Sequence, residues 1–367
     1  MAVPKLRFKE FDADYTNTTF EKLKGFSIQS GKSEEKGDTG EFPFYGSTGV
    51  IGYKDIFDYE GKSILIARVG ANAGSLYQID GKYSVSDNTL RLTVSDDTSL
   101  DYLRELLIKF NLNRLVFGTG QPLVTGGMIK KVNIFIPEFT EQTKIATFLS
   151  AVDEKISQLT QKHELLSQYK QGMMQKLFSQ EIRFKADDGS EFGEWENISV
   201  KEIFDVTRGQ VLAVSNTVSV ADTDYKYPVF SSQTKQKGLM GFYKKYLFED
   251  ALTWTTDGAN AGDVNFRKGK FYCTNVCGVL LSKKGYANLC IAEILNKVTH
   301  KYVSYVGNPK LMNNVMSEIP ITIPSNLEEQ TKIANFLSTI DQKIEVVAQQ
   351  IEQAKIWKKG LLQQMFV

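Results

Sequence analysis

Cysteine and histidine are scarce in this chain, with three and two residues in 367. Cys273, Cys277 and Cys290 have no histidine or further cysteine beside them. A disulfide framework and a zinc site are therefore not predicted. We expect the three cysteines to be reduced thiols in a core, which favours a cytoplasmic protein that holds no metal.

Long apolar runs and an excess of charge are missing too. The N-terminal MAVPKLRFKEFD has no apolar segment of the kind that a signal peptide needs. No stretch approaches the ~20 apolar residues of a membrane span. The net charge is only +1, from 44 basic and 43 acidic residues. Because a strong nucleic-acid surface usually shows in the total charge, any DNA surface here must be local.

Catalytic motifs are absent as well. Gly25 and the Gly31-Lys32-Ser33 segment are separated by five residues, so a phosphate loop is not formed. No Asp/Asn-Pro-Pro-aromatic segment for adenine methylation and no strand-borne nuclease pattern occurs. Asp153 and Asp341 lie beside predicted helix seams and are interpreted as exposed helix charges. His163 is interpreted as a seam residue, and His300 has no evident carboxylate partner, so we expect a chain that is non-catalytic by itself.

The chain does contain an internal duplication. Residues 141–156, EQTKIATFLSAVDEKI, and residues 329–344, EQTKIANFLSTIDQKI, are identical at 12 of 16 positions at an offset of 188. The same offset aligns two GANAG segments, at 70–74 and 258–262. LRFK at 6–9 recurs as IRFK at 182–185, where a second copy should begin. This self-similarity predicts two equivalent halves.

Each half ends in a predicted long helix. From Ile145 and from Ile333, apolar residues recur at alternating steps of four and three over more than four heptads, which is typical of a coiled coil. Each helix of roughly 33 residues would be about 50 Å long. We expect the two to pack antiparallel, with a pseudo-two-fold axis relating the halves. Ser325 and Glu328 predict a capping box for the second helix.

The segments before the helices have β-rich patterns. Strands are expected at 63–67, 90–94, 278–281 and 319–323, and short helices at 100–110 and 287–298. The predicted fold class is α+β: two β-rich mixed domains alternate with two long helices that pair as an antiparallel coiled coil. The predicted globular domains are residues 1–136 and 183–323, and the predicted helical regions are residues 137–182 and 324–367.

Some loops have residues suited to DNA. Residues 225–245 contain five lysines and no acid, with aromatic residues interleaved. Lysines suit phosphates, and a Ser-Ser-Gln-Thr loop suits base edges, but a solvated loop beside buried aromatics is an equal alternative. The GANAG loops are either tight structural turns or amide cradles for phosphate. The candidate DNA-binding residues are Tyr45, Ser47, Thr48, Arg68, Asn72, Gln121, Arg208, Ser231, Ser232, Gln233, Thr234, Lys235, Lys237, Asn260 and Lys310.

The paired segments 136–156 and 323–344, together with the endings YKQGMM at 169–174 and WKKGLL at 357–362, resemble the specificity subunits of type I restriction-modification systems. The resemblance implies that each globular domain reads one half of a split double-stranded DNA target. It also implies that the helices set the gap and dock two modification (methyltransferase) subunits, with restriction subunits joining the full complex. S-adenosylmethionine, ATP and Mg would then belong to those partners, and this chain would hold no cofactor. The docking or spacer candidates are Gln142, Tyr169, Lys170, Gly172, Gln330, Trp357, Lys358 and Gly360.

Lys170 and Lys358 occupy equivalent positions in the two seams, where lysine either fixes the register or marks a place where the seam opens to a partner. An alternative function keeps the fold and changes the role: a coiled-coil scaffold whose two heads bind proteins or glycans. Salt-dependent, sequence-selective DNA binding together with a methyltransferase partner would exclude that scaffold.

Overall fold

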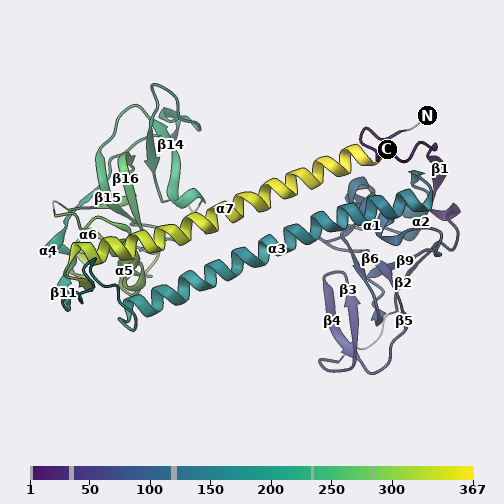
Figure 1. Cartoon of the computed structure of the whole chain (residues 1–367), viewed down its shortest axis with the longest axis horizontal. Coiled ribbons are helices and arrows are strands. Elements are labelled where there is room, and N and C mark those ends of the chain that lie inside the picture. The colour runs from purple at the N-terminus through teal and green to yellow at the C-terminus, as the bar shows by residue number, and fades with distance from the viewer. Residues whose placement is uncertain (1–2, 33–36, 117–121, 233–234, 283) are drawn as a thin grey trace. The chain divides into compact units, whose positions relative to one another are not determined.

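The computed structural model of the chain describes residues 3–32, 37–116, 122–232, 235–282 and 284–367. They divide into two compact units, which are labelled by element in Figure 1. Unit 1 comprises Met1–Lys162 with Val347–Val367, and unit 2 comprises His163–Val346. Each unit combines a mixed α+β head with the first part of one long helix and the last part of the other.

The head of unit 1 contains three small sheets. Two of them have four strands, in the orders β2-β9-β6-β7 and β4-β3-β8-β5, and β1 pairs with β10. The β3–β8 pair is parallel. The strands are β1 (Thr16–Thr19), β2 (Ser27–Ser30), β3 (Phe42–Gly46), β4 (Gly49–Lys54), β5 (Tyr59–Glu60), β6 (Ser63–Ala67), β7 (Leu76–Ile79), β8 (Lys82–Val85), β9 (Thr89–Thr93) and β10 (Asn133–Ile136). The helices are η1 (Phe20–Lys22), α1 (Leu100–Phe110), η2 (Leu112–Leu115) and α2 (Gly126–Lys130).

The head of unit 2 repeats this plan with one larger sheet. Six strands lie in the order β12-β17-β15-β16-β13-β14, and β11 pairs with β18. The strands are β11 (Trp195–Ser199), β12 (Asp205–Arg208), β13 (Tyr227–Phe230), β14 (Leu239–Tyr243), β15 (Phe248–Thr255), β16 (Val264–Cys273), β17 (Cys277–Leu281) and β18 (Pro320–Pro324). The helices are α4 (Val200–Ile203), η3 (Val214–Asn216), η4 (Lys235–Gly238), α5 (Leu289–Thr299), η5 (His300–Tyr302) and α6 (Asn313–Glu318).

The strand registers show that the two heads are copies. Leu65 pairs with Tyr77 in unit 1, and Thr253 pairs with Asn265 in unit 2, so both partners are displaced by the same 188 positions. The difference in sheet size is located at one turn of the strands. In unit 1, Gly61 and Gly81 have φ +92° and +106° and the strands end beside them, whereas in unit 2 β15 and β16 continue past a register shift at Glu249–Ala251, where Asp250 and Gly269 also have positive φ.

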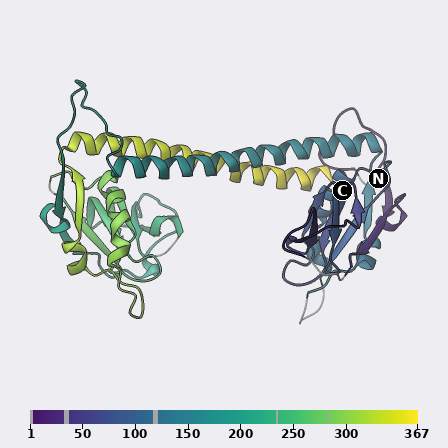
Figure 2. The same ribbon diagram turned by 90° about the horizontal axis from the view of Figure 1, so that it is seen from below.

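The long helices are α3 (Phe139–Phe178) and α7 (Leu327–Met365). Every predicted seam residue is buried or half-buried. In unit 1, Leu149 of α3 shares a core with Leu361 of α7, and in unit 2, Leu177 of α3 shares a core with Leu337 of α7. Because the first part of one helix packs with the last part of the other in each unit, the pairing is antiparallel, as predicted. Figure 2 shows the end of α7 beside the first part of α3.

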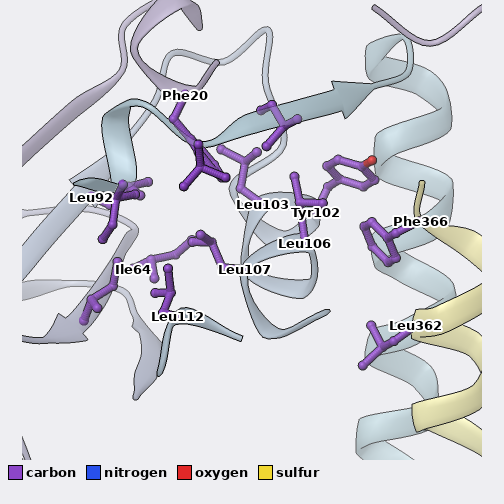
Figure 3. Packing of buried hydrophobic residues seen from close by; sticks show 14 of the residues in the cluster. Phe20, Ile64, Leu92, Tyr102, Leu103, Leu106, Leu107, Leu112, Leu362 and Phe366 are labelled. Atoms are coloured by element: carbon purple, nitrogen blue, oxygen red, sulfur yellow. The ribbon is translucent and has the colours of Figure 1, made fainter. Parts of the chain in front are cut away.

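The long helices and the heads share continuous cores. Leu362 of α7 and Phe366, just after the end of α7, face Tyr102 and Leu106 of α1 in Figure 3. The ring centroids of Tyr102 and Phe366 are 5.1 Å apart. Burying a side chain of this size stabilises a fold by about 1.5–3 kcal/mol. In each unit, therefore, the head is fixed to its helix segments by apolar packing.

Most sequence predictions of elements are confirmed, because strands and helices occur at all the predicted places within a residue or two. The three cysteines are buried and free, as expected. The predicted capping box of Ser325 and Glu328 is wrong. Since α7 begins at Leu327, the residue before it is Asn326, whose Oδ1 accepts from the Glu328 amide at 2.7 Å. Ser325 Oγ donates instead to the Glu194 carbonyl at 2.9 Å.

Within the described part of the chain, no helix is long and apolar enough to span a bilayer. Nor does any group of three or more His, Cys, Asp or Glu side chains in these residues lie where it could hold a metal ion.

Candidate nucleic-acid interface

The seam lysine of unit 2 is the centre of an ion cluster. Lys170 Nζ lies 2.8 Å from an oxygen of Asp341 on α7 and 3.0 Å from Glu293 on α5. Only 18% of the lysine side chain is exposed. Burial lowers the pKa of Lys170, but the hydrogen bond that Lys170 donates to Asp341 and the charge of Glu293 outweigh it, so the pKa is raised. This contact joins both long helices and the head.

Unit 1 contains the same cluster, displaced by 188 residues. Lys358 Nζ lies 2.6 Å from Asp153 on α3 and 3.1 Å from Glu105 on α1, and the Glu105 side chain is 1% exposed. Both seam lysines therefore make contacts inside their own units, which supports the register interpretation over an opened seam. The interpretation of Asp153 and Asp341 as simple exposed charges is wrong, because each forms an ion pair with a seam lysine.

A second repeated contact ties the start of each head to its long helix. Arg7 donates to both oxygens of Glu141 at 2.8 and 2.7 Å, and Arg183 does the same with Glu329 at 2.9 and 2.8 Å. Both glutamates are completely buried. Tyr15 also donates to Glu141 at 3.0 Å, and burial together with that carboxylate raises the pKa of Tyr15. Bidentate arginine pairs of this kind fix geometry as well as charge.

Gln142 and Gln330 lie inside the units rather than on a docking surface. The Gln142 amide donates to the Pro137 carbonyl at 2.9 Å, and the Gln330 amide donates to the Pro324 carbonyl at 2.8 Å. Their side-chain oxygens accept from Ser99 N and Asn288 Nδ2, both at 2.9 Å. They hold the beginning of each long helix, so of the two roles predicted for them only the spacer role fits their burial.

The remaining docking candidates lie on the outer side of the long helices. Tyr169 is 51% exposed, and its counterpart Trp357 is 54% exposed. Gly172 and Gly360 follow three positions later, and a Cβ added at either would meet nothing within 4 Å. Residues three apart share a helix face, so each tyrosine or tryptophan lies beside a glycine.

The GANAG loops are tight turns with the same hydrogen bonds in both units. Gly74 N donates to the Ala67 carbonyl at 2.9 Å, and Gly262 N donates to the Thr255 carbonyl at 2.9 Å. The first glycine of each loop also donates outside it, to Pro122 and Pro309. With these amides occupied, the structural interpretation is favoured over a phosphate cradle. Asn72 is exposed and Asn260 is half-buried.

Other charged candidates flank these turns. Arg68 is half-buried and makes a long contact of 3.4 Å with the Asp87 carbonyl. Lys310 is exposed and lies 3.7 Å from Asp257. Arg208 is exposed at the end of β12. Gln121, Gln233 and Thr234 lie outside the described residues, as does the side chain of Lys235.

In unit 1, the predicted aromatic loop packs against the neighbouring sheet, on β7. Tyr45, at the end of β3, lies with its ring centroid 5.9 Å from that of Tyr77. Tyr77 donates its hydroxyl to the Gly46 carbonyl at 2.6 Å, and burial raises its pKa to about 12. Ser47 is half-buried and Thr48 is exposed in the turn between β3 and β4.

The equivalent loop of unit 2 is held differently. Ser231 N donates to the Gly238 carbonyl at 2.8 Å, and Ser231 Oγ accepts from Thr274 at 3.1 Å. Ser232 is half-buried, and Lys237 is exposed. Lys237 also has a left-handed backbone with φ +52°, a conformation that costs free energy in residues other than glycine.

Sequence reasoning missed a polar pocket behind this loop. Its lining includes Ser231, Lys237, Asn260, Asp263, Asn265 and Arg267. His300 Nε2 lies 3.4 Å from Asp263, which corrects the expectation that His300 has no carboxylate partner. An arginine within a strand gives no local sign in the sequence that it lines a pocket, because that depends on the loop folded across it.

Two duplicated α+β heads, each fixed to a segment of paired long helices, define a recognition protein with two modules. The model of the type I restriction modification DNA specificity domain matches residues 19–168 and 193–355. The chain therefore belongs to this family, and it is a type I specificity subunit with two target-recognition domains.

Relatives agree with this assignment. The chain is 27% identical over 340 residues to the type I restriction enzyme MjaVIII specificity subunit of Methanocaldococcus jannaschii, covering 82% of this chain and 77% of that protein. It is 36% identical over 143 residues to the putative type I specificity subunit S.MpnORF289P N-terminus of Mycoplasma pneumoniae, covering 38% and 74%. The crystal structure of a type I restriction-modification S subunit from M. genitalium has a TM-score of 0.74 at 18% identity over 100% of this chain and 99% of that one, which shows the shared fold.

Proposed function

We propose that each head reads one half of a bipartite, gapped double-stranded DNA target, and that the chain does so in complex with two modification subunits. The observation that carries the proposal is the division between what the copies share and what they do not. The ion clusters, the buried arginine–glutamate pairs and the GANAG turns are repeated. The loops beside Gly46 and Ser231 differ in both residues and contacts. Repeated parts suit a scaffold, and divergent loops suit two different half-sites.

The long helices supply the spacer in this proposal. Their apolar seams and ion clusters pack the two helices together within each unit, which suits a stiff spacer between two readers. Since half-sites are met at separations set by the helical repeat of DNA, the spacer length would set the gap. Inserting residues after Leu159 should lengthen the tolerated gap and leave both half-sites unchanged. The same gap with a new half-site would refute the spacer role.

The outer faces at Tyr169 and Trp357 are the proposed docking sites for the modification subunits. An exposed aromatic residue is an effective anchor in protein interfaces. Glycine inside a helix costs about 1 kcal/mol relative to alanine, and among the described residues neither Gly172 nor Gly360 has a neighbour that requires it. Glycine at both positions would allow a partner subunit to approach the helix backbone closely.

Chemistry belongs to the partners in this account. We infer that methyl transfer and cleavage, with S-adenosylmethionine, ATP and Mg, reside on modification and restriction subunits and that this chain is non-catalytic by itself. The near-neutral charge of +1 makes tight DNA binding depend on the assembled complex. Family membership argues against the alternative scaffold with protein- or glycan-binding heads.

The test is expression of the chain with its modification subunits, followed by mapping of methylated DNA. The proposal expects one asymmetric motif with two specified parts and an unspecified gap. Complexes that form but methylate a single continuous motif, or no defined motif, would refute it.

A further inference from the structure

The strongest unassigned feature is the guanidinium of Arg267 on β16. Its residue is 9% exposed, yet no carboxylate of the described residues pairs with it. It is oriented by three contacts: Nε donates to Thr253 Oγ1 at 2.9 Å, Nη2 donates to the Lys237 carbonyl at 2.7 Å, and Cζ lies 3.7 Å from the centre of the Phe230 ring. An unpaired buried cation is costly, so its retention calls for a ligand.

The remaining donors of Arg267 are available to that ligand. A guanidinium has five N–H groups, and two of them are used by Thr253 and Lys237. Three have no acceptor among the described residues, and the side chain lines the polar pocket. Stacking on Phe230 keeps the guanidinium plane fixed, which is the preorganisation that bidentate recognition requires.

The other polar groups of the pocket favour a nucleobase edge over a phosphate. Asp263 lines the same pocket and would repel a phosphate, whereas its carboxylate accepts readily from an amino group. Asn260 and Asn265 add amides that both donate and accept. In the major groove, a G·C pair presents two adjacent acceptors on guanine and an amino donor on cytosine. Arginine and a carboxylate match that pattern together.

The equivalent place in unit 1 has different residues. Tyr77 stands where unit 2 has Asn265, and its hydroxyl donates to the Gly46 carbonyl at 2.6 Å. Ile79 occupies the position equivalent to Arg267, at the same offset of 188. Two readers of different half-sites should differ at such a point.

We propose that Arg267, with Asp263 and Asn265, reads the edge of a G·C base pair in the half-site recognised by unit 2. This inference rests on the proposed function, and it names the residue that sets one position of the motif. A bidentate arginine contact discriminates against the wrong base by roughly 5- to 150-fold.

The test uses the assembled complex of the full chain with its modification subunits and maps methylation for wild type, Arg267→Gln and Asn265→Tyr. The second variant copies the residue of unit 1 and keeps the contacts of Arg267 to Thr253 and Lys237. We expect both variants to accept other bases at a single G·C position of the motif. This position should lie in the half-site that residues 183–323 read. Lys268→Gln is the control, because Lys268 is exposed on the same strand and should leave the motif unchanged.

The outcomes separate this inference from the proposed function. A wild-type motif that is not bipartite refutes the function. A bipartite motif with no G·C pair in the unit 2 half-site refutes the role of Arg267 but leaves the proposed function standing. An unchanged motif in either variant has the same consequence. A loss that is equal at all sequences would indicate a phosphate contact and would also overturn it. If Arg267→Gln fails to assemble, the Asn265→Tyr motif decides.

Discussion

The Nζ atom of Lys358 lies 2.6 Å from Asp153, and the same lysine is 3.1 Å from the buried Glu105. These three charged residues from α7, α3 and α1 thus meet at the seam, and Arg104 of α1 also pairs with Glu105 and Asp153. Their counterparts at an offset of 188 meet in unit 2. The same ion cluster therefore attaches the head to the long helices in both units.

Replacing Lys358 with methionine should destabilise unit 1 by about 2 kcal/mol, because Glu105 is 1% exposed and would lose one of its two cationic partners, keeping only Arg104. The measurement is urea unfolding of the full chain, followed by tryptophan fluorescence. Lys359→Met is the control, since Lys359 is exposed one residue away and should change stability by no more than about 0.5 kcal/mol. Equal effects of the two changes would contradict a specific role for the cluster.

The unit 2 cluster should give stability a distinct alkaline dependence. The pKa of Lys170 is raised in the folded chain from its ordinary 10.5, so the charged form is favoured by folding. Its contribution is fully present below pH 10.5 and is lost as the pH rises through the higher folded pKa. The free-energy difference between wild type and Lys170→Met should therefore be constant from pH 7 to about 10 and shrink above it. A difference that grows in alkali would be inconsistent with this sign.

Removing the buried carboxylate of Glu329 should be costly, because the Arg183 guanidinium would lose both of its 2.8–2.9 Å bonds. Glu329→Ala is expected to lower the free energy of unfolding by about 3 kcal/mol. The adjacent Glu328→Ala is the matched control, because that side chain is 45% exposed and should have an effect within about 0.5 kcal/mol. Calorimetry of both variants decides, and a mild Glu329 effect would argue against an anchoring role.

Trp357→Ala should leave folding largely intact but weaken assembly. The indole is 54% exposed, so its loss should reduce stability by less than about 1 kcal/mol. As an anchor for a modification subunit, its truncation should raise the Kd about 30-fold. Ile356→Ala is the control, because Ile356 is 69% exposed and its counterpart Gln168 is polar. Titration calorimetry with the modification subunit would count against this docking face if both variants bound like wild type.

Periodicity and self-comparison predict the architecture because they depend on local pattern. The heptad seams and the offset of 188 locate α3, α7 and the paired strands. The seam lysines could be found in the same way, but their head partners Glu105 and Glu293 could not, because a contact across more than 100 residues leaves no periodic trace. Comparison of acids at the shared offset shows only that Glu105 and Glu293 are repeated, not what they contact.

The pocket illustrates the other limit. Arg267 becomes significant only when the loop at Lys237 folds over it and Phe230 lies beneath it. Candidate residues chosen for composition, such as Lys310, turn out to have partners of their own. Composition identifies regions that differ between copies, whereas the reading geometry depends on tertiary packing.

The central claim is that the two heads read independently. Its most direct test replaces residues 183–323 with the equivalent segment of a relative, expresses the chimaera with the modification subunits, and maps the methylated motif. The account predicts a new sequence in one half-site, with the other half-site and the gap unchanged. A change in both half-sites, or in neither, would contradict it.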